Sequence, residues 1–299
     1  MLGKRVDFPF LLSLKMDWDE DAPAHSLAAS FAVDAPAPRL ARVEVLHEGV
    51  LVFRGIVDQQ DTKISPQGNR LRLVARSLAA LLLDNEALPQ TYINPSLRGL
   101  FERHARPYGF PSFAGNGGAF RGKLTVEKGM SEWQVLQGFC DYFLGASLSV
   151  RPDGVLDAAG DPPKGLLRFS NTDGIPYQSV THQDFFCRRI QEIWLQAGVG
   201  TGYQGHVVDA ETAGLGIQRK RYKTATNYQG TSVLRKSRRQ AEECTLSCPG
   251  WVPAQLGMEA SLADPFFGES DGWTVAKCTY QQSQAGESTC CVLRKKLQP

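Results

Sequence analysis

Hydrophobic and polar residues alternate in two runs within the first third of the chain. The runs span 51–58 and 70–76, and the segment 65–69 between them (SPQGN) is rich in turn-forming residues. Alternation with a period of two is typical of strands that bury one face, so the pattern predicts a β-hairpin. The second run leads into Ser77-Leu-Ala-Ala-Leu-Leu-Leu, where we expect the Ser77 hydroxyl to cap a short apolar helix.

The residues before this hairpin are also strand-like. We expect strands over 6–15, 26–33 and 42–46, with an acidic loop over 17–21. Together with the hairpin, these segments predict a strand-rich first domain over 1–84, with about six strands closed by a helix.

After residue 85 the pattern changes to helical spacing. Asn94-Pro95-Ser96 is typical of a helix start, and a second amphipathic helix is expected to begin at Met130-Ser131. The first helix is expected to bury one face, which consists of Leu97, Leu100, Phe101 and His104. The second is expected to place Trp133, Leu136, Gln137, Cys140 and Phe143 on one face. With a strand at 123–126 and a hairpin turning at Pro152-Asp153-Gly154, this region predicts a small α/β insertion over 85–162.

The last part of the chain is strand-like again. Strands are expected over 166–170, 179–189 and 190–197. We expect a glycine-rich mobile loop over 199–216, and a helix over 231–244 whose basic residues precede its acidic ones, an order unfavourable for the helix macrodipole. A final hairpin is expected over 271–294. These elements predict a second β-barrel domain over 163–299, with an inserted loop and helix at about 199–262.

Two of the predicted hairpins share a spacing. Gly68 precedes Arg76 by eight residues, and Gly286 precedes Arg294 by eight residues, each arginine closing a return strand. Coincidence between two ordinary hairpins explains this spacing, and so does duplication. The simplest summary is a duplicated domain, and the predicted fold class is β-rich α+β, with two tube-like β-barrel domains and an inserted α/β module.

Composition narrows the function classes. The chain has 299 residues, 42% hydrophobic and 21% charged, with a net charge of +2. Such a balance is typical of a globular protein without the basic excess that phosphate-backbone binding needs, so we expect no specific nucleic-acid binding. No run approaches the roughly 18 apolar residues of a membrane span, and no membrane insertion is expected. Seven scattered cysteines favour reduced thiols in a cytoplasm over a disulfide scaffold.

Two glycine-rich segments match nucleotide-binding patterns only in part. Residues 200–205 read GxGxxG, but no helical pattern follows to hold a pyrophosphate, so a loop is favoured. Residues 117–123 have the Walker glycine–lysine spacing, but Leu124 replaces the Ser or Thr that would hold Mg²⁺. We expect no cofactor.

Metal and catalytic patterns are equally weak. The cysteines at 244, 248, 278, 290 and 291 lack zinc-knuckle spacing, so buried thiols are favoured. The acidic residues over 17–21 lack the glycine of a calcium loop. None of the five histidines lies in a nucleophile or HExxH motif; they are His25, His47, His104, His182 and His206. We predict no catalytic, cofactor-binding or metal-binding residue and no enzymatic activity.

Several motifs in sequence order resemble the central baseplate hub proteins of contractile-tailed phages and phage-like particles, including the Mu-type tail hub and the hub family of Bacillus prophages. The first is FRGIVDQQD followed by GNRLRLVARSLAALLLDNEALP, with Phe53, Gly55 and Arg76 at the matching positions. NPSLRGLFERHARPYGF and TVEKGMSEWQVLQGFCDYFLGASLSVRPDGVLDA follow, and the closing GWTVAKCTYQQSQAGESTCCVLR is similar to the family's final hairpin.

The resemblance implies a structural role. Family members have two tube-like barrels, so a homotrimer presents six barrels to a hexameric tail tube protein and joins it to a trimeric central spike protein. It also implies contacts with other baseplate and tape-measure components, a lumen, and a place in the tail baseplate of a virion or phage-like particle assembled in the bacterial host cytoplasm. Alternatives from another class are a tail-associated cell-wall hydrolase or a peptidoglycan-binding module, the latter because 123–158 has a strand–helix–hairpin pattern.

Basic residues are the candidates for contact with partners or the lumen. Arg70, Arg72 and Arg76 alternate with leucines on the return strand, and further basic runs lie at 219–223 and 235–239. An interface, a lumen surface and an ordinary solvated face all fit these patterns.

Overall fold

The computed structural model describes residues 5–144, 147–161, 163–198, 200–224 and 230–296. By their internal contacts they form two units. The first extends to Asp161 and includes Thr279–Glu287, and the second contains Pro162–Cys278 and the residues from Ser288 onwards. The predicted division into three domains at residues 84 and 162 stays a prediction.

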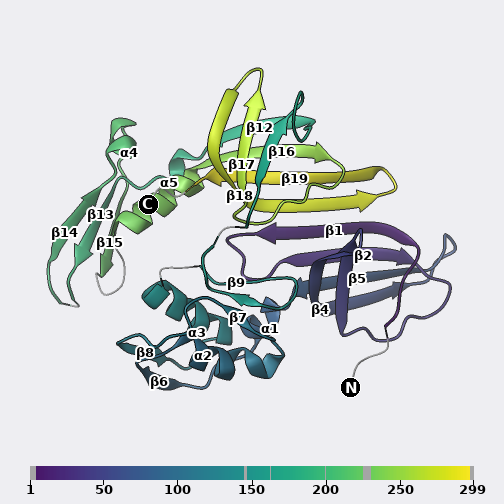
Figure 1. Cartoon of the computed structure of the whole chain (residues 1–299), viewed down its shortest axis with the longest axis horizontal. Helices are drawn as coiled ribbons and strands as arrows, with labels where there is room; N and C mark the ends of the chain where they lie inside the picture. Colours follow the sequence, from purple (N-terminus) through teal and green to yellow (C-terminus); the bar gives the residue numbers. More distant parts are fainter. Residues whose placement is uncertain (1–4, 145–146, 162, 199, 225–229, 297–299) are drawn as a thin grey trace. The chain divides into compact units, whose positions relative to one another are not determined.

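The first unit begins with an antiparallel sheet (Figure 1). Its strands are β1 (Leu11–Asp19), β2 (Ser26–Ala32), β3 (Arg42–His47), β4 (Val50–Lys63) and β5 (Arg70–Ser77). They lie in the order β1-β2-β5-β4-β3. Five strands form where about six were expected. The first begins at Leu11 rather than Val6 and extends through Asp17, which was predicted to be in a loop. The alternating positions bury Met16, Leu27, Phe53 and Leu73, as period two requires.

The short helix α1 (Ala79–Asp84) follows β5, but Ser77 does not cap it. Leu78 holds the N-cap position without a side-chain hydrogen bond. Ser77 is the last residue of β5, and its Oγ accepts a hydrogen bond from the His25 N–H at 3.0 Å. The cap prediction was wrong because the strand continues one residue further than the pattern showed, which directs the hydroxyl to a neighbouring strand.

The remaining part of the first unit is the α/β module, built from short strands and two helices. Its helices are α2 (Leu97–His104), the 3₁₀ turn η1 (Arg106–Tyr108), α3 (Glu132–Phe139) and the π turn η2 (Cys140–Leu144). Its strands are β6 (Gln90–Ile93), β7 (Phe113–Ala114), β8 (Lys123–Val126), β9 (Ser149–Val150) and β10 (Leu156–Asp157). Both predicted helix starts are confirmed, since Ser96 accepts from the Gly99 N–H and Ser131 forms a capping box with Gln134. The predicted apolar faces are buried in one core that contains Leu97, Phe101, Trp133 and Leu136.

The second unit contains another strand set. Its members are β11 (Leu166–Ser170), β12 (Ser179–Asp184), β16 (Glu242–Pro249), β17 (Glu259–Asp264), β18 (Gly268–Ser283) and β19 (Gly286–Lys295). Hydrogen-bonded neighbours follow the order β12-β16-β19-β18-β17, and β11 pairs in parallel with β17. The predicted closing hairpin is confirmed as β18–β19.

The two strand sets repeat one strand order. In chain order the first set is β1 to β5, and the second is β12, β16, β17, β18 and β19. In each set the first strand lies beside the second, the second beside the fifth, the fifth beside the fourth, and the fourth beside the third. The fold is therefore β-rich and internally repeated. Over the described residues the strand order is open at β12 and β3, so two closed barrels are not confirmed.

The insertion between β12 and β16 is a small sheet with helices (Figure 1). It contains the 3₁₀ turn η3 (Phe186–Arg188), β13 (Glu192–Gln196), β14 (Tyr203–Val208), α4 (Ala210–Gly214), β15 (Lys220–Thr224) and α5 (Gly230–Ala241). The loop predicted over 199–216 is wrong, because β14 and α4 occupy most of it; residue 199 lies outside the described residues. Predicted strand 179–189 stops at Asp184.

Helix α5 ends three residues earlier than predicted. Glu242, Glu243 and Cys244 belong to β16, where Cys244 is buried beside Leu293 of β19. The helix thus lacks the acidic C-terminal half, and Arg238 and Arg239 lie in its last turn. Cations at this end are favourable for the macrodipole, so the expected electrostatic penalty does not arise.

Candidate assembly surfaces

The hairpin β4–β5 extends past the strand that covers its outer edge. The pairing of β4 with β3 stops at Ile56, whereas its pairing with β5 continues to Lys63. Asp61, Thr62 and Lys63 are exposed, and at the turn Ile64 is 80% exposed. This end of the hairpin is a strand edge with an apolar tip, which is a feature that folded proteins cover or charge.

The corresponding hairpin β18–β19 has a covered tip. Residues Thr279–Glu287 belong to the first unit, where β18 lies beside β1. The Thr279 hydroxyl donates to Asp17 Oδ1 at 2.7 Å. Asp17 also forms an ion pair with Lys15, so part of the predicted acidic loop serves strand pairing.

The three arginines of β5 have different partners. Arg70 donates to Ser30 Oγ at 2.7 Å, and Arg72 lies 3.6 Å from Asp61. Arg76 bonds Asp58 at 2.7 Å and Asp84 at 2.7 Å, and its hydrogen bond lowers the pKa of the Asp84 carboxyl. Arg76 therefore joins β4, β5 and the end of α1.

The arginine at the equivalent place in the second set has a comparable task. Arg294 donates to Glu243 Oε1 at 2.8 Å, across the β16–β19 pair. Arg188 donates to the same oxygen at 2.8 Å. Arg76 and Arg294, the two arginines of the shared spacing, thus both bond carboxylates. This favours a role for them in stabilising the fold.

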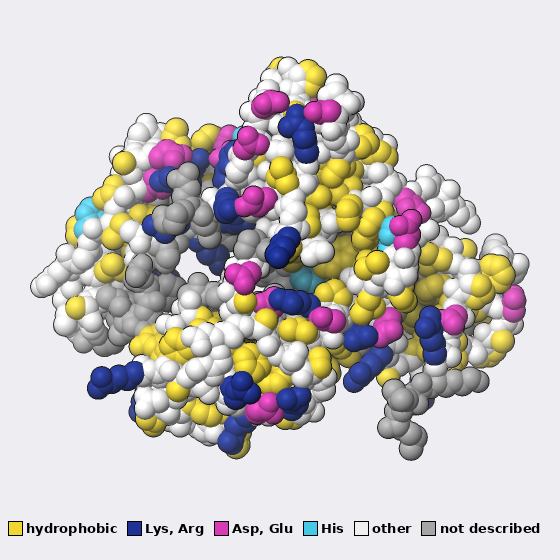
Figure 2. Space-filling model, viewed as in Figure 1, with side chains coloured by type: hydrophobic (Ala, Val, Ile, Leu, Met, Phe, Trp, Pro, Cys, Tyr) yellow, Lys and Arg dark blue, Asp and Glu magenta, His cyan; other side chains and the backbone are white. Residues whose placement is uncertain are grey.

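The two other basic runs lie in the insertion, and most of their guanidinium groups are engaged. Arg219 donates to the Phe186 carbonyl at 2.7 Å, and Arg239 to Thr274 Oγ1 at 2.8 Å. Arg235 and Lys236 on α5 are exposed. On the face in Figure 2, cationic and anionic side chains are interspersed, in keeping with the net charge of +2.

One ion pair between a buried carboxylate and a half-exposed arginine joins α5 to the start of α4. Arg238 donates to Asp209 Oδ1 at 2.6 Å, and the same carboxylate caps α4 by accepting from the Thr212 N–H at 3.1 Å. Burial by itself raises the pKa of Asp209, but the bonds from Arg238 and Thr212 outweigh it, and the pKa lies below its ordinary value. The carboxylate thus occupies the helix N-terminus that follows the GxGxxG residues.

The insertion sheet has an aromatic face that was not predicted from the sequence. Trp194 stacks on His206 with ring centroids 4.0 Å apart, and Tyr203 lies edge-on to Tyr222 at 5.0 Å. His206 Nε2 lies 2.8 Å from Glu192 Oε2. The alternation of these residues along 192–196 and 203–208 was the available signal, and it was hidden by the assignment of 199–216 to a loop.

The α/β module contains a chain of polar side chains within its core. Tyr92 Oη lies 2.7 Å from His104 Nε2, His104 Nδ1 bonds Glu132 Oε2, and the Tyr108 hydroxyl donates to Glu132 Oε1 at 2.9 Å. His104 is 1% exposed and Glu132 is 7% exposed. Burial and the bond to Glu132 raise the pKa of Tyr108. The helix-face prediction placed His104 correctly but not its partners, which come from β6, η1 and α3.

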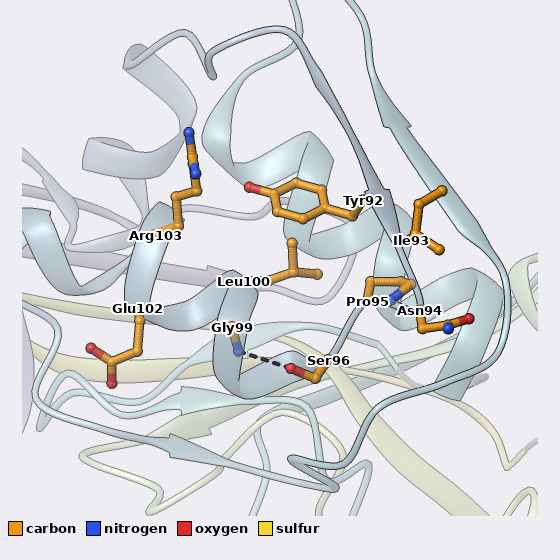
Figure 3. Close-up of a pocket in the computed structure, with 9 residues that line it drawn as sticks. All are labelled: Tyr92, Ile93, Asn94, Pro95, Ser96, Gly99, Leu100, Glu102 and Arg103. Atoms are coloured by element: carbon orange, nitrogen blue, oxygen red, sulfur yellow. Dashed lines mark hydrogen bonds between the residues drawn. The ribbon is translucent and has the colours of Figure 1, made fainter.

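A pocket of ≈ 520 Å³ is lined by the end of β6, the turn that follows it and α2 (Figure 3). In the close-up, the Tyr92 ring extends over Leu100 towards Arg103, while Glu102 points away from it. Asn94, Pro95 and Ser96 border the pocket, and Ser96 accepts the Gly99 N–H at 3.1 Å as the helix cap. These polar groups serve the local fold.

The segments with partial nucleotide motifs lead into strands. The second half of the GxGxxG segment, including Gly205, lies in β14 (Tyr203–Val208), and Leu124 lies in β8 after the Walker-like residues. Among the described residues, no group of three His, Cys, Asp or Glu side chains is placed to hold a metal ion. Eight of the ten candidate histidines and cysteines lie in strands: His47, His182, His206, Cys244, Cys248, Cys278, Cys290 and Cys291. The prediction of no catalytic, cofactor-binding or metal-binding residue stays a prediction. No helix of the described segments is long and apolar enough to span a membrane.

Solved structures of phage tail proteins share this fold. The tail protein from Neisseria meningitidis has a TM-score of 0.78 at 20% identity, over 96% of this chain and 92% of that one. The 43 kDa tail protein of prophage MuSo2 from Shewanella oneidensis has a TM-score of 0.77 at 14% identity, over 95% and 93%. A type VI secretion component from E. coli, described as structurally similar to bacteriophage T4 tail proteins, has a TM-score of 0.57 at 9% identity, over 96% and 73%. No protein-family model and no curated protein sequence matches. The chain thus has the fold of phage tail proteins.

Proposed function

We propose that the protein is the structural baseplate hub of a contractile tail or injection particle. Three copies form a ring around a lumen, which joins a hexameric tail tube to a trimeric central spike. The carrying observation is the repeated strand order of β1–β5 and of β12 with β16–β19. Two similar sets in one chain allow three copies to present six similar sets, so that three-fold symmetry on one side matches near six-fold symmetry on the other.

The comparisons support a tail component in this role. The neighbours with the same fold are phage tail proteins and a type VI secretion component, and further neighbours are complexes of VgrG with PdpA from Francisella. Their coverage of nearly the whole chain supports a complete tail-protein fold rather than a borrowed module. A cell-wall hydrolase gains no support from them. Each tube-like barrel remains part of the proposal, to be completed by contacts between copies.

Mass in solution and electron microscopy test the proposal. The chain is mixed with the tail tube and spike proteins of its own particle, then analysed by light scattering and negative-stain imaging. We expect three copies of the chain and a ring with an open centre. A chain that stays monomeric and binds neither partner would contradict the hub function.

The same particles can be used to test which surface of the chain faces the lumen. Arg72 and Arg235 are exposed cationic positions on separate strand and helix surfaces. Either residue is replaced by cysteine in a Cys187→Ser background and labelled with a gold cluster. The label then lies either inside or outside the ring. A label inside at one of the sites assigns the lumen face, and a solid particle without an open centre would contradict the conduit.

A further inference from the structure

We propose that the tip of the β4–β5 hairpin of one copy pairs with the free edge of β12 in a second copy, with Asp61 facing Gln183. The proposal rests on the ring of the proposed function and names the strands that close it. It follows from comparing the two strand sets rung by rung.

The ladders of the two sets correspond residue by residue. Asp17, Ser26 and Arg76 are paired with one another across β1, β2 and β5, and we call such a row of paired residues a rung. Gln183, Glu243 and Arg294 form the matching rung across β12, β16 and β19. Both rungs end on the arginine of the shared spacing. Asp17 and Gln183 are therefore equivalent positions on the first strand of each set.

The hairpins can be matched in the same way. Strand β18 ends at Ser283 and β19 begins at Gly286, so pairing back from this turn places Cys278 opposite Cys291 and Thr279 opposite Cys290. The same register places Thr274 opposite Lys295, and Arg239 donates to both, to Thr274 Oγ1 at 2.8 Å and to the Lys295 carbonyl at 2.6 Å.

In the first set, Asp61 lies opposite Arg72 on β5. Arg72 precedes Arg76 by four residues, as Cys290 precedes Arg294. Asp61 is therefore the equivalent of Thr279, after a one-residue irregularity in β4 between Val57 and Gln59.

One of the two equivalent contacts exists within the chain. The β18–β19 tip lies beside β1, and the Thr279 hydroxyl donates to Asp17. Its equivalent joins Asp61 to Gln183. The side chains are complementary there as well, because the Gln183 amide N–H₂ can donate to the Asp61 carboxylate.

Equivalent residues of the two strand sets differ in exposure, as expected if the contact at β12 is not made within one chain. Met16 of β1 is 1% exposed, whereas its rung equivalent His182 of β12 is exposed. Tyr280 of β18 is 3% exposed, whereas its equivalent Thr62 of β4 is exposed. Over the described strands, β12 has one neighbour only, β16, so its other edge is open to β-strand addition.

A second copy is the occupant that fits this edge. In the proposed ring, each copy gives its β4 tip on one side and receives a neighbour's tip at β12 on the other. Such a heterologous contact closes into a ring when the rotation between copies closes. Six strand sets then alternate around the ring, each first strand covered by a hairpin tip.

Disulfide cross-linking tests the pairing. Asp61→Cys and Gln183→Cys are made separately in a Cys187→Ser background, which removes the exposed thiol of the wild type. The two variants are mixed, assembled with tube and spike proteins, and oxidised. Facing residues on neighbouring strands lie within disulfide range, so we expect a reducible dimer band in the mixture only. A single chain with both substitutions should give covalent trimers.

The controls separate this pairing from the hub function. Either variant alone should give no dimer, and neither should Glu44→Cys on β3 mixed with Gln183→Cys. A complex of three copies by light scattering, in which the Asp61→Cys and Gln183→Cys mixture stays uncross-linked, would overturn the pairing and leave the hub function standing. A chain that remains monomeric with both partners would overturn both.

Discussion

Gly68 and Gly286 share a backbone φ of +115° and hold the same position relative to the arginine that ends each return strand. A φ of this value is rarely adopted by residues with a Cβ, so a glycine is needed at both hairpin turns. A Cβ built at either position would meet no atom within 4 Å, so only the backbone enforces the choice. The two hairpins thus share the conformation of this glycine as well as the spacing.

Replacement of either glycine by alanine should destabilise the protein by about 1–3 kcal/mol, because the side chain strains the turn without relieving any contact. The thermal unfolding midpoint measures the loss. Gly138→Ala is the matched control: Gly138 lies within α3, where a Cβ also meets nothing, and alanine there should raise stability by about 0.5–1 kcal/mol. Equal behaviour of the three variants would argue against turn strain.

Much of this fold could be predicted from local patterns. The helix starts at Ser96 and Ser131 were found because a side-chain cap, a following apolar face and a preceding turn agree within a few residues. The β18–β19 hairpin was found because alternation persists on both sides of its turn.

What local patterns missed was decided by residues distant in sequence. Ser77 was expected to cap a helix, but His25, 52 residues earlier, takes its hydroxyl. Glu242 and Glu243 were predicted to lie in a helix. They lie in β16 instead, where Glu243 pairs with Arg294 of β19 and accepts its hydrogen bond. The Tyr92–His104–Glu132–Tyr108 cluster needs four elements folded together, so no local spacing in the sequence predicts it.

Glu132 should be a determinant of stability in the α/β module rather than a catalytic acid. Its carboxylate accepts from Tyr108 and bonds His104 within the core, so Glu132→Ala removes the partner of the buried His104 Nδ1 and of the partly buried Tyr108 hydroxyl. We expect a loss of about 2–4 kcal/mol, measured by chemical unfolding, and a smaller loss for Glu132→Gln. The exposed Glu127→Ala should change stability by less than about 0.5 kcal/mol. A neutral Glu132→Ala variant would refute a stabilising role.

The seven cysteines should differ sharply in reactivity. Cys187 is exposed, Cys290 is half-buried and the other five are buried. Burial raises the pKa of Cys140 and Cys248 to about 12, so their thiolates are scarce at neutral pH. A thiol reagent at pH 8 should label one site quickly in the folded protein and seven after denaturation. Cys187→Ser should remove the fast reaction; its persistence would mean that a buried thiol becomes accessible.

His25 should make the protein less stable in mild acid. Burial lowers its pKa to about 4, against an opposing effect of Asp19, and its Nδ1 has no hydrogen-bond partner among the described residues. Above pH 6.5 the imidazole is neutral in both folded and unfolded chains, so His25 contributes no pH dependence there.

As the pH falls from 6.5 to 4, the unfolded chain binds a proton that the folded chain refuses, and the free energy of unfolding declines. Below pH 4 both states are protonated at this site, and the contribution of His25 levels off. The loss should be on the order of 2 kcal/mol after allowance for partial exposure of the ring. His25→Gln removes this titration while keeping a polar side chain, so the difference in unfolding free energy between wild type and variant should change between pH 6.5 and 4 and stay constant above that window. Parallel pH profiles for the two proteins would show that the imidazole is solvated in the folded chain.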